Sequence, residues 1–334
     1  MPLNYSIAEE NRSGYRVLVL RDEARDQTVR ILPEVGANVF DYSVRHRGER
    51  YPILEPPPSV EVIGQRPTAH GNPVLFPFPN RIRQGRWSWQ GRTYQFEDTS
   101  AGGNHIHGLV YYRPWEVAVH RSTPDGATAS FSFRSTDHED IGRQYPFPFE
   151  LLLSCTLHEG ALQLDFSATN VGEAPMPMGY GLHPYFSAPI GSETAPEDCR
   201  IVVPAEAYWE LEDFLPTGKV LPVSGKYDLR GGRPLAGLRF DDVFTQVLLD
   251  PDGRWRCRIE DEGIGLRTVV EAESIFREIV VYTPPGRRAI CFEPYTCPTD
   301  APNLAARGLD VGLIVLEPEE TFSATVRVIP EPMG

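Results

Sequence analysis

Short segments in which apolar and polar side chains alternate recur along almost the whole chain, and this pattern constrains the fold more than any other feature. Clear examples are residues 15–22, 129–135, 162–169 and 321–330. A side-chain period of two is typical of β-strands. Helical periodicity is almost absent, and we expect only one short helical turn, near Asn303–Gly308.

The chain is therefore predicted to be all-β, with roughly 18–22 strands arranged as a large twisted antiparallel sandwich. Its 29 glycines and 32 prolines supply the many turns that such a fold needs. The turn-rich stretch 184–200 has strand patterns on both sides, so we interpret it as a long loop and not as a linker. We expect residues 1–334 to form a single domain. No repeat of fixed period appears, which disfavours a propeller or a β-helix.

Charge and composition narrow the class of function. The chain has 32 basic and 46 acidic residues, and the net charge of −14 argues against nucleic acid as a partner. No apolar run approaches the roughly 20 residues of a membrane span, and no secretory signal is visible at the N-terminus. The five cysteines are scattered, and we interpret them as reduced thiols. A cytoplasmic protein that binds no membrane is expected.

Four segments break the rhythm of strands and turns. They are residues 71–82, 103–108, 179–186 and 291–301, and each places a polar residue of a catalytic type among aromatics, glycines and prolines. Two histidines, a glutamate and an arginine form a plausible acid–base set. Flanking aromatic rings suit a sugar, because its C–H faces pack on rings while its hydroxyls need polar partners. The alternative is that each polar residue is held in its loop by local hydrogen bonds.

The motifs in these segments resemble those of the aldose 1-epimerase (galactose mutarotase) family. The resemblance rests on N-R-I at 80–82, N-x-x-H-G at 104–108, F-D-D-x-F at 240–244, H-x-Y-F at 183–186 and E-P-x-T-C-P-x-D-A at 293–301. Each motif is short, but all five occur in the family's order. The resemblance implies a galactose mutarotase-like supersandwich that binds a sugar on its concave face and needs no cofactor.

The resemblance also implies a role for each matching residue. Glu293 would be the general base that takes the proton of the anomeric hydroxyl, and His183 the general acid that protonates the ring oxygen. The ring would then open, the C1–C2 bond would rotate, and closure would deliver the other anomer. The implied sugar-binding positions are Asn80, Arg81, His107 and Asp241. Asp242 is an alternative to Asp241, although the spacing to Phe244 favours Asp241.

Residue chemistry agrees with the two catalytic roles. Glu293 follows the apolar run 289–292 and precedes a proline, which predicts a partly buried carboxylate with a raised pKa. His183 precedes Pro184, which favours an extended backbone. An imidazole with its ordinary pKa of about 6.5 would give and retake a proton readily.

A metal site is the main alternative role for the histidines. His105 and His107 alternate along a predicted strand, so both could face one way and bind an ion. No further ligand is spaced to complete such a site, and we expect no metal. A glycoside hydrolase or lyase using Asp241 and Glu293 as paired carboxylates is a more distant alternative.

The chain departs from the family pattern in and near the expected sugar site. P-F-P precedes N-R-I, Leu109 follows Gly108, Leu182 precedes His183, and Tyr295 replaces a glutamine. These departures leave the preferred aldose open. A non-catalytic sugar-binding protein of the same fold therefore remains an alternative, and a monomer or homodimer is expected in either case.

A phosphorylated sugar is a further alternative. A hexose-6-phosphate 1-epimerase would need a cationic grip on the phosphate, for which Arg81, Arg83 and Arg86 are candidates. The overall charge of −14 opposes a dianionic substrate. We therefore expect a neutral aldose as the small-molecule partner.

Overall fold

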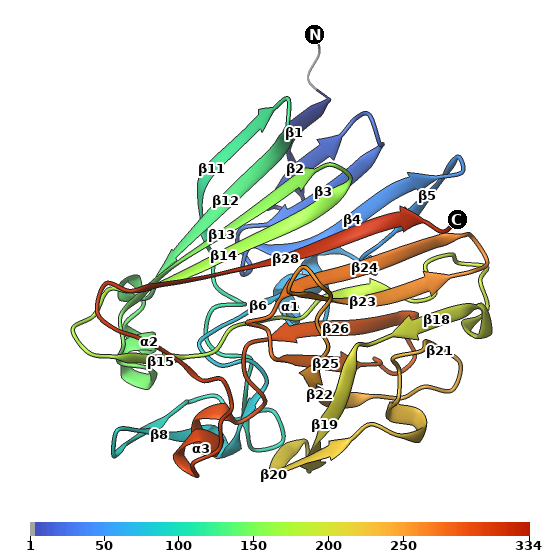
Figure 1. The fold of residues 1–334 in the computed structure, drawn as a ribbon. Coiled ribbons are helices and arrows are strands. Elements are labelled where there is room, and N and C mark those ends of the chain that lie inside the picture. The colour runs from blue at the N-terminus through green and yellow to red at the C-terminus, as the bar shows by residue number, and fades with distance from the viewer. Residues whose placement is uncertain (1–3) are drawn as a thin grey trace.

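A computed structural model describes residues 4–334 and confirms the predicted all-β class (Figure 1). The largest sheet has nine antiparallel strands. In spatial order these are β11 (Glu116–Thr123), β12 (Gly126–Arg134), β13 (Phe149–His158), β14 (Ala161–Asn170), β28 (Thr321–Pro332), β24 (Leu266–Glu273), β23 (Arg254–Asp261), β18 (Cys199–Val202) and β21 (Arg233–Pro234). The C-terminal strand β28 lies between β14 and β24, so it joins the two halves of this sheet.

A second sheet of eight shorter strands carries the predicted site residues. Its order is β20 (Leu215–Pro222), β19 (Ala205–Glu212), β22 (Asp241–Val247), β25 (Glu278–Tyr282), β26 (Ala289–Tyr295), β16 (Gly181–Leu182) and β6 (Val74–Leu75), and β17 (Tyr185–Ser187) also pairs with β26. Every residue of β26 is buried, so this strand lies in the interior of the sheet and is covered on both faces. That position explains its nearly continuous apolar sequence.

The N-terminal part of the chain forms a sheet of five strands in sequence order. These are β1 (Tyr5–Arg12), β2 (Tyr15–Asp22), β3 (Gln27–Leu32), β4 (Asn38–His46) and β5 (Glu49–Pro52). Three two-stranded ladders complete the β structure: β7 (Arg81–Ile82) with β10 (His105–Ile106), β8 (Arg86–Trp89) with β9 (Arg92–Gln95), and β15 (Met176–Met178) with β27 (Ile314–Leu316). One large apolar core runs through these sheets and includes Tyr42, Trp87, Phe166 and Trp255.

Helices are short and few in the described part of the chain. The α-helices are α1 (Val60–Gln65), α2 (Glu139–Gln144) and α3 (Ala301–Ala306), and single 3₁₀ turns occupy Arg83–Gly85, Ser135–Asp137, Pro196–Asp198 and Gly225–Tyr227. The sequence located α3 to within about two residues, which is the usual uncertainty of a helix end. It missed α1 and α2, because six residues are too few to establish a helical period. No helix within residues 4–334 is long and apolar enough to cross a membrane.

Two further expectations need correction. The described residues form 28 strands, more than the 18–22 expected, because many strands of the eight-stranded sheet and the ladders are only two to four residues long. The segment 184–200 is not a plain loop. It contains β17 and the start of β18, and β17 pairs with β26 next to the predicted base.

Candidate active site

All six residues predicted for the site line one cavity of about 360 Å³ on a face of the eight-stranded sheet. They come from five separate parts of the chain, and the fold brings them together. The remaining lining residues are Arg66, Thr68, Ala69, Ile106, Tyr185 and Tyr282, and the predicted ones are Asn80, Arg81, His107, His183, Asp241 and Glu293.

Strand register brings the acidic residues to the same face. Asp241 lies opposite Tyr282, and Tyr282 lies opposite Cys291, two residues before Glu293. Because side chains alternate along a strand, Cys291 and Glu293 share the face that Asp241 also occupies. Asp242 points to the other side, where its Oδ1 accepts a hydrogen bond of 3.4 Å from the Tyr227 hydroxyl. The structure therefore selects Asp241 over Asp242 as the cavity residue.

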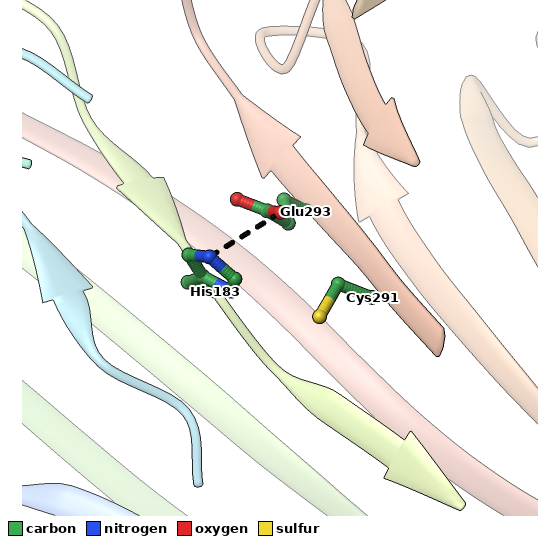
Figure 2. A group of neighbouring side chains, drawn as sticks. All are labelled: His183, Cys291 and Glu293. Atoms are coloured by element: carbon green, nitrogen blue, oxygen red, sulfur yellow. Dashed lines mark ion pairs between the residues drawn. The ribbon is translucent and has the colours of Figure 1, made fainter. Parts of the chain in front are cut away.

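Glu293 and His183 both line the cavity, and Figure 2 shows their side chains facing each other. Nε2 of His183 lies 3.5 Å from Oε1 of Glu293, and the residues are 6% and 2% exposed. The His183 ring stacks on Tyr185, with ring centroids 4.8 Å apart and planes inclined by 9°. Tyr282 presents its edge to the same ring at 6.3 Å. These contacts fix the orientation of the imidazole beside the carboxylate.

Tyr295 holds the other oxygen of the carboxylate. Its hydroxyl donates a short hydrogen bond to Oε2 of Glu293, and both residues are buried. The ring has room because residue 181 is glycine: a Cβ at Gly181 would overlap the tyrosine ring. With Oε2 occupied in this way, Oε1 is the oxygen that faces His183.

Burial controls the protonation of the pair. It raises the pKa of Glu293 well above its usual range, with the Tyr295 hydrogen bond and the Arg81 charge opposing the shift and the Asp241 charge adding to it. Burial also lowers the pKa of His183 to about 3. Burial therefore favours the neutral form of each partner, the protonated carboxyl of Glu293 and the unprotonated imidazole of His183. The pKa of this imidazole thus departs from the ordinary value of about 6.5, because the residue is buried apart from its contact with the cavity.

Two left-handed residues shape the opposite wall. Asn80 and His107 have φ of 58° and 66°, and the His107 N–H donates to the Asn80 carbonyl at 2.9 Å. His107 directly follows β10, and its ring lies beside that of His183, with the two ring centroids 5.2 Å apart. His105 instead stacks on Phe96 at 4.1 Å and does not line the cavity. The two histidines thus face different surroundings, contrary to the metal-binding alternative in which both face one way.

Arg81 is the cation closest to the acidic residues of the cavity. Its guanidinium lies 4.6 Å over the ring of Phe214 and bonds Oδ1 of Asn80 at 3.3 Å. Burial raises the pKa of Asp241, and the positive charge of Arg81 partly offsets this rise. Arg81 is therefore held by the Phe214 ring and the Asn80 side chain, an arrangement that leaves donors for the hydroxyls of a ligand.

Sequence reasoning missed several lining residues. Tyr185 had a usable signal, because it lies inside the H-x-Y-F motif. Tyr282 belongs to an alternating strand, but only the register of β25 shows that it faces the cavity. Arg66 and Thr68 follow the short helix α1, which the sequence did not reveal.

Comparison with known proteins agrees with this architecture. The sequence profile of the family described as aldose 1-epimerase matches residues 18–328. An uncharacterized Escherichia coli protein, YihR, is 25% identical over 260 residues, which cover 75% of this chain and 76% of YihR. A galactose mutarotase-like protein from Clostridium acetobutylicum is 27% identical, with a TM-score of 0.90 over 99% of both chains.

A more distant structure shows the same fold. A galactose 1-epimerase from Lactobacillus acidophilus is 19% identical, with a TM-score of 0.77 over 99% of this chain and 100% of that one. Since the family profile spans nearly the whole chain and the predicted motif residues meet in one cavity, the chain belongs to the aldose 1-epimerase family.

Proposed function

We propose that the protein is a mutarotase, an aldose 1-epimerase that interconverts the α and β anomers of a hexose. The observation that carries this proposal is the His183–Glu293 pair, with 3.5 Å between Nε2 and Oε1. The pair lines a cavity to which Arg81 contributes a positively charged side chain and Asp241 a second carboxyl group. Mutarotation opens and closes a hemiacetal by proton transfer with no other reactant, so one acid and one base beside the same hemiacetal are sufficient.

The reaction uses the proton that the buried pair shares. Transfer of this proton from Glu293 to His183 creates the carboxylate and the imidazolium. The carboxylate then takes the proton of the anomeric hydroxyl and the imidazolium protonates the ring oxygen, while the bond from C1 to the ring oxygen breaks and C1 becomes the carbonyl of the open-chain aldehyde. Arg81 favours this form, because its charge stabilises ionised Glu293. After the C1–C2 bond rotates, the same transfers run in reverse and close the ring as the other anomer.

Asn80, Arg81, His107 and Asp241 are proposed to bind the hydroxyls of the sugar. Their amide, guanidinium, imidazole and carboxylate groups offer both donors and acceptors around the cavity. Tyr282, which is only partly buried, supplies aromatic surface for the C–H face of the sugar, whereas the buried Tyr185 ring packs against His183 and Arg287. No step in this scheme requires a cofactor.

A neutral aldose fits the charges of the cavity better than a sugar phosphate. Arg83 and Arg86 are exposed and do not line the cavity, and Arg83 lies 3.8 Å from the Asp300 carboxylate. Arg81 is shared with Phe214 and Asp241. One observation favours the phosphorylated alternative: Arg66 is exposed and lines the cavity.

Polarimetry on freshly dissolved α-glucose, α-galactose and α-glucose 6-phosphate tests the proposal. We expect catalysed mutarotation, with kcat/KM at least about tenfold higher for a neutral sugar than for the phosphate. A preference for the phosphate that disappears in Arg66→Ala would favour the phosphorylated alternative. Sugar binding without any acceleration would instead indicate a non-catalytic binding protein. A cytoplasmic location, the monomeric or homodimeric state and the absence of nucleic-acid and membrane partners stay predictions.

A further inference from the structure

A buried thiol lies directly beside the acid–base pair and has no part in the proposed reaction. Cys291 shares its strand face with Glu293, and its cross-strand neighbours are Tyr185 and Tyr282, which both line the cavity. One ligand atom from each of His183, Cys291 and Glu293 lies within 4.8 Å of the other two (Figure 2). Within residues 4–334, this is the one group of three metal-type donors at such distances.

These three donors match the preferences of one class of ion. Imidazole nitrogen, thiolate sulfur and carboxylate oxygen bind Zn²⁺ at about 2.0–2.3 Å. Donors separated by up to 4.8 Å can reach one such ion after side-chain shifts of about 1 Å or less. One polar atom of this group is also unpaired, because Nδ1 of the buried His183 has no hydrogen-bond partner. His183 and Glu293 line the cavity and Cys291 lies buried behind them, so an ion reaches the three donors from the cavity side.

We propose that His183, Cys291 and Glu293 form a binding site for one thiophilic divalent cation of the zinc class, and that the bound ion blocks the acid–base pair. When the sulfur–metal bond forms, the thiol proton leaves to solvent, and no oxidation or reduction occurs. The ion occupies lone pairs that the proton transfers need, so it acts as an inhibitor and not as a cofactor. The blocking effect rests on the proposed mutarotase function, whereas the binding site does not.

Cadmium is the direct probe, because a cadmium–thiolate bond has a charge-transfer band in the ultraviolet. Metal-free protein is titrated with Cd²⁺, and Zn²⁺ affinity is then measured by competition with a chromogenic chelator. Cys291→Ala is the test variant. Cys257→Ala is the matched control, since Cys257 is equally buried but belongs to no such donor group. Circular dichroism checks that each variant is folded.

We expect one equivalent of Cd²⁺ to produce the band in the wild type and in Cys257→Ala. Cys291→Ala should lose the band and bind Zn²⁺ at least about tenfold more weakly, as for loss of a ligand. Absence of the band in the wild type, or its survival in Cys291→Ala, would overturn the site.

Mutarotation with and without Zn²⁺ tests the blocking effect separately. We expect Zn²⁺ to inhibit the wild type in proportion to its occupancy, and a chelator to restore the rate. In Cys291→Ala, inhibition relative to that variant's own metal-free rate should need at least about tenfold more Zn²⁺. A wild-type rate unchanged at full occupancy would overturn the blocking effect. If the band appears but the metal-free wild type does not catalyse mutarotation, the proposed function fails while the metal site stands.

Discussion

The eight-stranded sheet contains two buried glutamates in neighbouring regions, and only one of them reaches the cavity. Glu293 lies opposite Val280 in the ladder of β25 and β26, and Glu278 lies opposite Tyr295 two residues along the same ladder. Each carboxyl group is 2% exposed. Burial raises the pKa of both, in the case of Glu278 to about 8. By burial and protonation alone, the two residues are hard to distinguish.

Their neighbours differ. Glu293 faces His183 and the cavity, whereas Glu278 accepts a hydrogen bond of 3.0 Å from Nε1 of Trp209. Trp209 belongs to a small apolar cluster that α3 covers through Leu304. The comparison teaches that a raised pKa does not by itself mark a catalytic carboxylate. Catalysis also needs a proton partner and access for a ligand.

The largest expected effect follows from removing the proposed base. Glu293→Gln keeps the shape of the side chain but removes its basicity, so kcat for mutarotation should fall at least about a hundredfold. Glu278→Gln is the matched control and should keep kcat within about threefold. Turnover by both variants is measured by polarimetry on folded, purified protein. Equal losses in the two variants would show that the distinction between the regions is wrong.

Tyr295→Phe should have a smaller effect through the position and ionisation of Glu293. Its hydroxyl favours the carboxylate, so its loss should raise the pKa of Glu293 further and make the reactive form rarer. We expect kcat to fall about tenfold with little change in KM, and the alkaline limb of the pH–rate profile to move to higher pH.

Tyr145→Phe is the control for that variant. It removes an equally buried hydroxyl, which donates to the Pro177 carbonyl at 2.8 Å and lies outside the cavity lining. Its pH–rate profile should match that of the wild type. A shift of the same size in both variants would exclude a specific role for Tyr295.

Glu278 should affect stability and not turnover. Its folded-state pKa of about 8 exceeds the usual value of 4.5, so between these values the folded state keeps a proton that the unfolded state has lost. The contribution of this group to stability is present at low pH and is lost as pH rises toward about 8. Glu278→Gln does not titrate, so its melting temperature relative to the wild type should rise from about pH 5 to about pH 9. A constant difference would contradict the assigned protonation.

The smallest expected effect lies outside the cavity. Arg86 is exposed and does not line the site, so Arg86→Ala should change kcat/KM for a neutral aldose by less than about twofold. Initial-rate polarimetry at low ionic strength measures this, because screening is weakest there. A larger loss would extend the functional region beyond the cavity residues.

The regular part of the fold was readable from the sequence. In β14 the buried and partly exposed residues alternate along most of the strand, as the sequence pattern predicts for one face on a core. The strands β6, β7, β10 and β16 have two residues each, so they contain no measurable period. These short strands carry or adjoin the cavity residues, and their pairing depends on tertiary contacts.

The candidate site was predictable in its residues but not in its electrostatics. The five short motifs contain the six predicted residues, all of which line the cavity, but the other six of the twelve lining residues were not named. The choice between Asp241 and Asp242 required the register with Tyr282, which adjacent residues in a sequence do not reveal. The lowered pKa of His183 follows from its burial against Tyr185 and Tyr282, which only the structure reveals. Both properties arise from packing between distant segments.

The space shared by Gly181 and Tyr295 has an evolutionary consequence. A β-carbon at 181 and a tyrosine ring at 295 would overlap, so position 181 is restricted to glycine for as long as tyrosine occupies 295. A lineage that acquired the tyrosine must already have carried glycine at 181, and reversal must begin with the loss of the ring. Among relatives, tyrosine at the position of 295 should therefore occur only with glycine at the position of 181, and the glycine should appear first in a family tree.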